Sequence, residues 1–300
     1  MPHELIDRLV GDLPILTDGA WGTQLQALGL ATGEGSDPWN LSHPEKVEAV
    51  ARSYVEAGSR IILTNTCQAS RFPLERQGLS DQVSEINRAG AEISKRAAGD
   101  KAFVFASMGP SGKMLTMGEI AEEELFSAFS EQADALAEGG ADGIVLETMG
   151  DLAEIKIALA AAKRTGLPVV ACMCFDSGKN KDRTLMGVTP EQAAEELTDA
   201  GADVVGANCG QGIEGYIGIC ERLCQSTTLP VWIKANAGLP VIEDGKAVYQ
   251  TTAEQFADSI PAVLEKGASF IGGCCGTSPD FIRVVSGRLS DDRRGPHQTH

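Results

Sequence analysis

Three cysteines follow β-branched runs of the sequence, and thiolates at such positions can bind a metal ion. Cys209 comes directly after Asn208, and Cys274 and Cys275 stand together in a Gly-Gly-Cys-Cys-Gly-Thr phrase. Neighbouring side chains of a regular strand point to opposite faces, so the pair can serve one centre only where the backbone leaves β geometry. The flanking glycines permit that departure.

Three thiolates without a fourth protein ligand match a catalytic zinc site with one position left open. Two other interpretations stay open from the residues alone, a buried apolar trio and a glycine-rich phosphate loop, although a phosphate loop has no use for thiols. A zinc ion with three thiolates is a weak Lewis acid but holds a further soft ligand well. An incoming thiol would lose its proton there, and its sulfur would become electron-rich enough to attack a methyl group.

The remaining cysteines are predicted to be small buried apolar side chains. Eight cysteines in 300 residues are too sparse for a disulfide scaffold, and a reducing cytoplasm would keep them as thiols. The five outside the trio are Cys67, Cys172, Cys174, Cys220 and Cys224.

The charge balance favours small molecules or proteins as partners. With 25 basic and 42 acidic residues the net charge is −17, which argues against a nucleic-acid or anionic-membrane surface. No stretch reaches the roughly 20 apolar residues that a membrane span needs, and the N-terminus mixes charged with apolar residues. We therefore expect a cytoplasmic protein.

One pattern recurs along the chain: a short apolar run, a small or polar cluster, and then a helical stretch. Alternating strands and helices make a parallel sheet, and eight such units predict a single (β/α)8 TIM barrel over residues 1–300, with a core of about 13–288. A doubly wound sheet is the alternative, but the first run does not lead into a dinucleotide-type glycine loop. The predicted strands are Ile15–Gly19, Ile61–Thr66, Ala102–Gly109, Gly143–Thr148, Val169–Phe175, Val204–Gly210, Val231–Gly238 and Phe270–Thr277.

Glycines are predicted to end several of the helices that precede these strands. Gly58, Gly140, Gly201 and Gly267 each stand where a helix C-cap needs a left-handed residue. The tail after Ser286 is predicted to be a helix end followed by a frayed segment, with His297 and His300 in solvent.

Polar residues end most of the predicted strands. In a barrel of this type the active site is built at the C-terminal ends of the strands, so these residues are its candidates. They are Asp18, Thr64, Asn65, Thr66, Glu147, Thr148, Asn208, Cys209, Asn236, Cys274 and Cys275.

Several of these phrases together resemble one known family. The chain is similar, from about Ile15 to Val285, to the homocysteine-binding methyltransferase barrel of cobalamin-dependent methionine synthase, betaine–homocysteine methyltransferase and S-methylmethionine-dependent enzymes. The phrases that carry the resemblance are Asp18-Gly19-Ala20-Trp21-Gly22-Thr23, Leu63-Thr64-Asn65-Thr66, Gly109-Pro110-Ser111-Gly112, Glu147-Thr148, Asn208-Cys209, Asn236-Ala237-Gly238-Leu239-Pro240 and Gly272-Gly273-Cys274-Cys275-Gly276.

The resemblance implies a homocysteine S-methyltransferase that makes methionine. It implies Zn²⁺ as cofactor, with the three cysteines as ligands and catalytic residues. It further implies that Glu147, with Asp18 nearby, meets the amino group of homocysteine, and that backbone amides near Gly19 and Ala20 receive its carboxylate. Asn208 and Asn236 complete the predicted substrate-binding set.

The methyl donor is expected to dock from outside the chain, because the barrel and its tail use all of the sequence. A methylated corrinoid protein is the preferred donor, and betaine or S-methylmethionine is the alternative. Two remote alternatives are a Schiff-base aldolase using Lys234 and a non-catalytic zinc-binding barrel. The sequence leaves the oligomeric state open, a homo-oligomer included.

Overall fold

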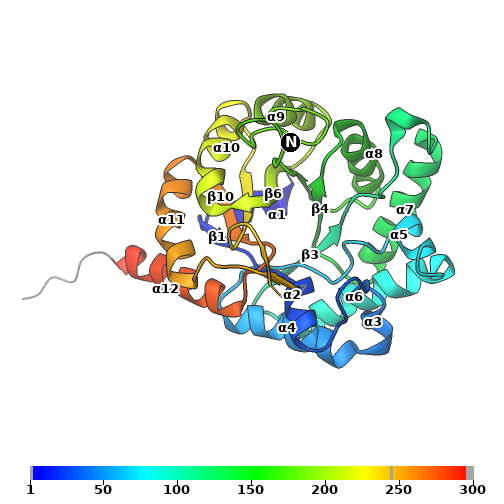
Figure 1. Ribbon diagram of the computed structural model, residues 1–300, viewed down its shortest axis with the longest axis horizontal. Coiled ribbons are helices and arrows are strands. Elements are labelled where there is room, and N and C mark those ends of the chain that lie inside the picture. Colours follow the sequence, from blue (N-terminus) through cyan, green and yellow to red (C-terminus); the bar gives the residue numbers. More distant parts are fainter. Residues whose placement is uncertain (1–2, 244–245, 295–300) are drawn as a thin grey trace, which may run out of the picture.

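Eight parallel strands curl into a barrel in the computed structural model, which describes residues 3–243 and 246–294 (Figure 1). Their order around the sheet is β1-β10-β7-β6-β5-β4-β3-β2. Arg60, the residue before β2, joins the two edges of this sheet and so closes the barrel. Its N–H donates to Leu16 O at 2.8 Å, and its carbonyl accepts from Phe103 N at 2.9 Å. The bounds are β1 (Ile15–Leu16), β2 (Ile61–Ile62), β3 (Phe103–Met108), β4 (Gly143–Met149), β5 (Val169–Met173), β6 (Val204–Gly212), β7 (Val231–Asn236) and β10 (Ala268–Gly273).

Helices follow the strands and cover the outside of the barrel (Figure 1). The α-helices are α1 (Glu4–Val10), α2 (Gly22–Ala27), α3 (Trp39–Ser42), α4 (Pro44–Glu56), α5 (Arg71–Glu75), α6 (Val83–Ala98), α7 (Glu122–Glu138), α8 (Leu152–Lys163), α9 (Pro190–Asp199), α10 (Ile213–Gln225), α11 (Ala253–Glu265) and α12 (Pro279–Arg294). Two short 3₁₀ turns are η1 (Ser80–Gln82) and η2 (Leu115–Met117).

The predicted barrel and its eight strands are confirmed, and so are the glycine helix ends. Gly58, Gly140, Gly201 and Gly267 have φ values of 106°, 89°, 88° and 105°. A residue with a Cβ would be strained in this left-handed region, so glycine allows each helix to end and the chain to turn directly into the next strand.

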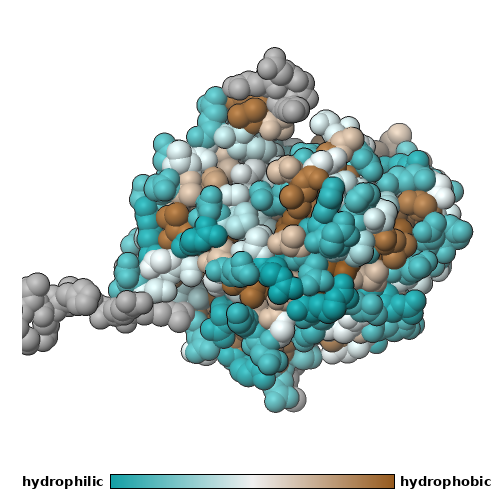
Figure 2. Space-filling model, turned by 90° about the horizontal axis from the view of Figure 1, so that it is seen from below, coloured by the Kyte–Doolittle hydropathy of each residue, from teal (hydrophilic) through white to brown (hydrophobic). Residues whose placement is uncertain are grey.

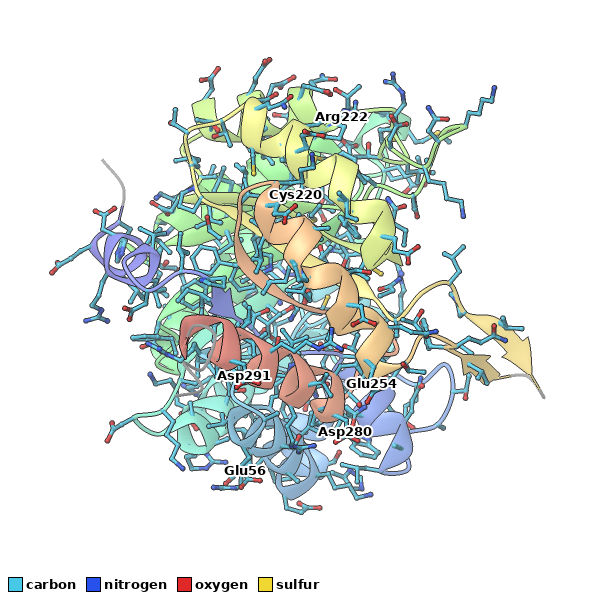
Figure 3. The ribbon with its side chains drawn as sticks, turned by 90° about the vertical axis from the view of Figure 1, so that its left-hand side faces the viewer. Glu56, Cys220, Arg222, Glu254, Asp280 and Asp291 are labelled. Carbon is cyan, nitrogen blue, oxygen red and sulfur yellow. The ribbon has the colours of Figure 1, made fainter. Side chains whose placement is uncertain are left out.

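Side chains fill the inside of the barrel, and α1 covers one end of it. Trp232 is fully buried between Phe105 and Phe270, with ring centroids 6.2 and 5.2 Å away. Ile6 and Leu9 of α1 belong to the same interior cluster. Figure 3 shows α1 at the opposite end of the barrel from a projecting two-stranded hairpin, β8 (Val241–Glu243) and β9 (Lys246–Val248). The C-terminal ends of the barrel strands therefore remain available for a site.

Three features of the fold lie outside the predicted elements. The β8–β9 hairpin interrupts the connection from β7 to α11, α1 precedes the predicted core, and α12 continues to Arg294. His297 and His300 lie outside the described residues. Within the described ranges, no helix is both long and apolar enough to cross a membrane. The face in Figure 2 is mostly hydrophilic with scattered hydrophobic residues, in keeping with the net charge of −17.

Candidate active site

The three predicted cysteines come together at the C-terminal end of the barrel. The Sγ atoms of Cys209, Cys274 and Cys275 all lie within 4.8 Å of one another, and those of Cys209 and Cys275 are 3.8 Å apart. Cys209 has a φ of 63°, so β6 leaves regular strand geometry there and turns this side chain toward the pair.

The backbone also leaves strand geometry at Cys274 and Cys275, as the flanking glycines predict. Strand β10 ends at Gly273, and the next two residues are fixed to the end of β7. Cys274 N donates to Ala235 O at 2.6 Å, and Cys275 O accepts from Ala237 N at 2.9 Å. A turn then follows, in which Thr277 N donates to Cys274 O at 3.1 Å. Two adjacent side chains can thus face one centre.

This set of donors fits a zinc ion. The thiols around Cys209 donate to its sulfur and hold the pKa of Cys209 far below its ordinary range, whereas the same contacts raise the pKa of Cys274. Cys174, a residue predicted to be structural, is one of those donors. Three cysteine sulfur atoms within 4.8 Å of one another match the preference of zinc for thiolate ligands.

A cavity of about 460 Å³ opens beside the cysteines. It is lined by residues from several strand ends, which is where a (β/α)8 barrel builds its sites. The lining includes the trio together with Gly19, Ala20, Trp21, Thr64, Asn65, Thr66, Glu147, Thr148, Lys234 and Tyr249.

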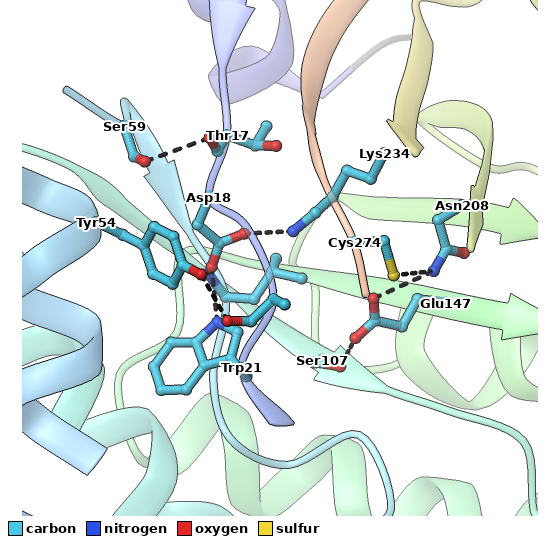
Figure 4. A network of polar contacts seen from close by, with 12 residues as sticks. Thr17, Asp18, Trp21, Tyr54, Ser59, Ser107, Glu147, Asn208, Lys234 and Cys274 are labelled. Atoms are coloured by element: carbon cyan, nitrogen blue, oxygen red, sulfur yellow. Dashed lines mark hydrogen bonds and ion pairs between the residues drawn. The ribbon is translucent and has the colours of Figure 1, made fainter. Parts of the chain in front are cut away.

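Glu147 presents a carboxyl group to this cavity. Ser107 Oγ donates to its Oε1, and Asn208 Nδ2 lies 3.4 Å from its Oε2 (Figure 4). Burial raises the pKa of Glu147, although the positive charge of Lys234 opposes this effect. The carboxyl group is held in place but keeps acceptor capacity for a ligand.

Asn208 is a bracing residue in the structure. Its Oδ1 accepts from Thr148 N at 2.6 Å, and its Nδ2 donates to Thr148 Oγ1 at 2.8 Å, which fixes Thr148 at its positive φ of 61°. The same Nδ2 lies 3.9 Å from Cys274 Sγ. Asn208, one of the predicted substrate-binding residues, is 1% exposed and contacts both Glu147 and Cys274.

Asp18 is fully buried, and the chain supplies three donors to its carboxylate. Oδ2 accepts from Trp21 Nε1 and Leu63 N, both at 2.7 Å, and Oδ1 pairs with the ammonium of Lys234 (Figure 4). Asp18 thus contacts two residues that line the cavity, Trp21 and Lys234, and its charge is already paired with a basic side chain.

The other predicted substrate-binding residues are close packed. Ala20 N donates to Thr277 Oγ1 at 3.1 Å, and a Cβ on Gly19 would lie 2.7 Å from the same oxygen. Asn236 is 5% exposed, and its Oδ1 has no hydrogen-bond partner among the described residues. An unsatisfied buried oxygen of this kind is uncommon and is consistent with a role toward a ligand.

Sequence reasoning did not single out Ser107 or Tyr249, which lie beside Glu147 and in the cavity wall. Lys234 was considered only as a Schiff-base residue. Burial lowers the pKa of Lys234, but Asp18 and Glu147 outweigh it and raise this pKa above its ordinary value. A Schiff-base lysine needs the opposite shift, so the aldolase interpretation has no support here.

The sequence pattern of the homocysteine S-methyltransferase family matches residues 15–289. The chain belongs to this family of methyltransferases. It is 31% identical over 300 residues to methionine synthase of Mycobacterium tuberculosis (strain ATCC 25618 / H37Rv) and 30% identical over 292 residues to that of Mycobacterium leprae (strain TN). These alignments cover 94% and 91% of the chain but 25% and 24% of the relatives, so the chain spans about a quarter of their length.

Solved structures agree on the fold. The metallated form of the homocysteine methyltransferase MmuM from Escherichia coli superposes with a TM-score of 0.80 at 23% identity, covering 94% of this chain and 99% of that one. The three sulfur atoms lie close enough together to bind one metal ion, which favours a metal site over an apolar trio or a phosphate loop.

Proposed function

We propose that this chain transfers a methyl group to the thiol of homocysteine and so forms methionine, with zinc held by Cys209, Cys274 and Cys275. The observation that carries the proposal is the position of the thiol cluster, which lies in the wall of the same cavity as the Glu147 carboxyl group. A cluster of soft donors suits a thiol, and a carboxylate suits an ammonium.

Each residue has a distinct task in this scheme. When bound, zinc lowers the pKa of a thiol so that it is a thiolate at neutral pH. Glu147 receives the ammonium of homocysteine, and Ser107 and Asn208 keep its carboxyl group oriented. Positioning of this kind places the sulfur where an incoming methyl group can reach it.

For the donor, we favour a methylated corrinoid protein that docks over the cavity. Large apolar side chains are exposed on three loops at the C-terminal ends of β3, β5 and β7, the end at which the cavity opens. Exposed apolar groups at the end of the barrel where a cavity opens suit the docking of a large partner. They are Met114, Met117, Leu185, Met186, Leu239 and Val241.

A cationic donor, betaine or S-methylmethionine, is the second candidate because two aromatic side chains line the cavity. Trp21 and Tyr249 could offer their faces to a quaternary ammonium or sulfonium group. The indole of Trp21 is fixed by its bond to Asp18, so such a face would be rigid.

The donor is tested by comparing methionine formation from homocysteine with methylcobalamin, betaine and S-methylmethionine at matched concentrations. We expect turnover with methylcobalamin or a methylated corrinoid protein. Turnover with betaine or S-methylmethionine alone would overturn the donor assignment and leave the thiol chemistry intact.

We also propose that the chain is one homocysteine-binding barrel that works in the cytoplasm. None of the eight cysteines is in a disulfide, which suits a reducing compartment.

A further inference from the structure

A second cavity, of about 340 Å³, lies next to the cavity beside the cysteines. Its walls come mainly from the segments that follow β3, β4 and β5, and Pro110 and Thr148 line both cavities. A volume of this size reaches the range of small-molecule sites, about 300–1,000 Å³. The proposed function gives this second cavity no ligand.

The walls of the second cavity combine carboxyl groups with apolar side chains. The acids are Asp151, Glu154 and Asp176, and the apolar wall includes Met114, Leu185 and Met186. Lys113 is the sole basic residue of the lining that the structure describes, and its ammonium lies over Phe72, 5.6 Å from the ring centroid. The cavity is therefore acidic, with an apolar surface beside the acids.

Glu154 is a buried carboxyl group that keeps a free acceptor oxygen. It lies in the first turn of α8 and is 5% exposed. Its Oε1 accepts from Ser111 N at 2.8 Å and from Ser111 Oγ at 2.6 Å, whereas its Oε2 has no hydrogen-bond partner among the described residues. A glutamate at this helix position often bonds back to the N-cap N–H, but this one reaches across to the loop after β3. Its second oxygen remains for a ligand in the cavity that Glu154 lines.

The positive charge that should accompany these acids is missing. Burial raises the pKa of Glu154 above its ordinary value and Asp151 adds to this effect, although the two bonds from Ser111 oppose it. Asp151 Oδ1 accepts from Ala153 N and Asp176 Oδ1 from Ser177 Oγ, both at 2.8 Å. Within residues 3–243 and 246–294, none of the three acids forms an ion pair. Buried carboxylates are normally paired, so a cationic ligand would supply what the chain does not.

We infer that the second cavity binds a small aliphatic amine, whose ammonium group pairs with Glu154 and whose carbon chain lies against Leu185 and Met186. An ammonium donates a charge-assisted hydrogen bond to the free carboxylate oxygen. Asp151 and Asp176 add negative potential at the same cavity. This site is separate from the cysteine trio, and it does not depend on the proposed function.

The test measures binding to the full chain by NMR, using isotope-labelled methionine methyl groups. Met114 and Met186 line the second cavity, so their signals report where a ligand binds. Met114→Leu and Met186→Leu assign the two signals. The probe is pentylamine, a cation at neutral pH, and pentan-1-ol and pentanoate are its neutral and anionic counterparts.

We expect pentylamine to shift both methyl signals and to bind about tenfold or more tightly than either counterpart. Affinity should also rise with chain length from ethylamine to pentylamine, because more apolar surface is buried. Glu154→Gln keeps an oxygen for Ser111 and should weaken pentylamine binding about tenfold or more. Asp176→Asn, at an exposed position that leaves the buried bonds intact, should weaken it about twofold to threefold.

Two control variants locate the effect. Glu195→Gln removes an exposed acid from α9, and Glu147→Gln removes the carboxyl group of the other cavity. Both should keep the pentylamine affinity of wild type within about twofold. The urea midpoint of each variant reports on its folding.

Absence of shifts at Met114 and Met186, or equal affinity for pentylamine and pentan-1-ol, would overturn the amine site. So would wild-type affinity in a folded Glu154→Gln chain, or a loss in Glu147→Gln as large as in Glu154→Gln. Each of these results would leave the proposed methyl transfer standing, because the assay uses neither homocysteine nor a methyl donor.

Discussion

Cys209 and Cys275 are 66 residues apart in the chain, yet their sulfur atoms lie 3.8 Å from each other at the end of the barrel. This contact forms because β6 and β10 flank β7, and the backbone turns out of strand geometry at both cysteines. Its consequence is a site for one soft metal ion.

We predict one zinc ion per chain. Cys209→Ala, Cys274→Ala and Cys275→Ala should each lose most of the metal, because two thiolates remain where three are needed. Elemental analysis of purified protein measures this loss. Cys224→Ala on α10 is the control and should keep full zinc content. A trio variant with the metal content of wild type would refute the ligand assignment.

Glu147→Gln should weaken homocysteine binding by roughly 1–3 kcal/mol and leave zinc in place, since the carboxyl group pairs with the substrate and is not a ligand. Titration calorimetry and metal analysis on the same sample separate these effects. Equal homocysteine affinity in wild type and variant would make Glu147 a structural residue.

Gly272→Ala should destabilise the protein by about 2–4 kcal/mol, because the new Cβ would lie 2.0 Å from Thr17 Oγ1 and 2.7 Å from Asp18 O. The urea midpoint measures the change. Gly287→Ala in α12 is the control, since no described atom lies within 4 Å of the place its methyl group would take, and alanine favours a helix. If both variants unfold at the same urea concentration, Gly272 is not a packing constraint.

The buried carboxyl group of Asp37 should make stability depend on pH. Burial raises its pKa from 3.8 to about 6, against the opposing hydrogen bond from Gln68 N. Between these values the unfolded chain has lost a proton that the folded chain keeps, so the unfolding free energy falls as pH rises through this window. Above about pH 6 burial of the ionised Asp37 carboxylate lowers the free energy of unfolding by its full amount, on the order of 3 kcal/mol.

Asp37→Asn removes this ionisation and keeps an oxygen for Gln68 N. The variant should therefore gain stability over wild type as pH rises from 4 to 7, as measured by urea denaturation. The exposed Asp291→Asn serves as control. If the stability of wild type and of Asp37→Asn changed with pH in the same way, the Asp37 proton would not contribute to the pH dependence of stability.

The barrel and the cysteine trio could be predicted because both depend on local patterns. Glycines after several helices and polar residues after most strands place these side chains on one rim, whatever their partners are. The β8–β9 hairpin was missed, although Asp244-Gly245 between two short apolar runs is a turn signal.

The pair of Lys234 and Asp18 could not be predicted from spacing. The pair forms only if the Lys234 side chain, near the C-terminal end of β7, faces the inside of the barrel. It also requires that β1 and β7 both lie next to β10. The roles of Asn208 and Ser107 as braces of Glu147 are of the same kind, since each joins different strands.

The central claim is that zinc on the cysteine trio activates the thiol of homocysteine, and proton release on binding tests it most directly. A free thiol with a pKa near 8.5 is mostly protonated at pH 7, so its activation should release about one proton per chain. Calorimetric titration of the zinc-loaded chain in buffers of different ionisation enthalpy measures this number. We predict close to one proton for wild type and none for the metal-free chain or Cys275→Ala. Homocysteine binding without proton release, or equal release from the metal-free chain, would contradict the account.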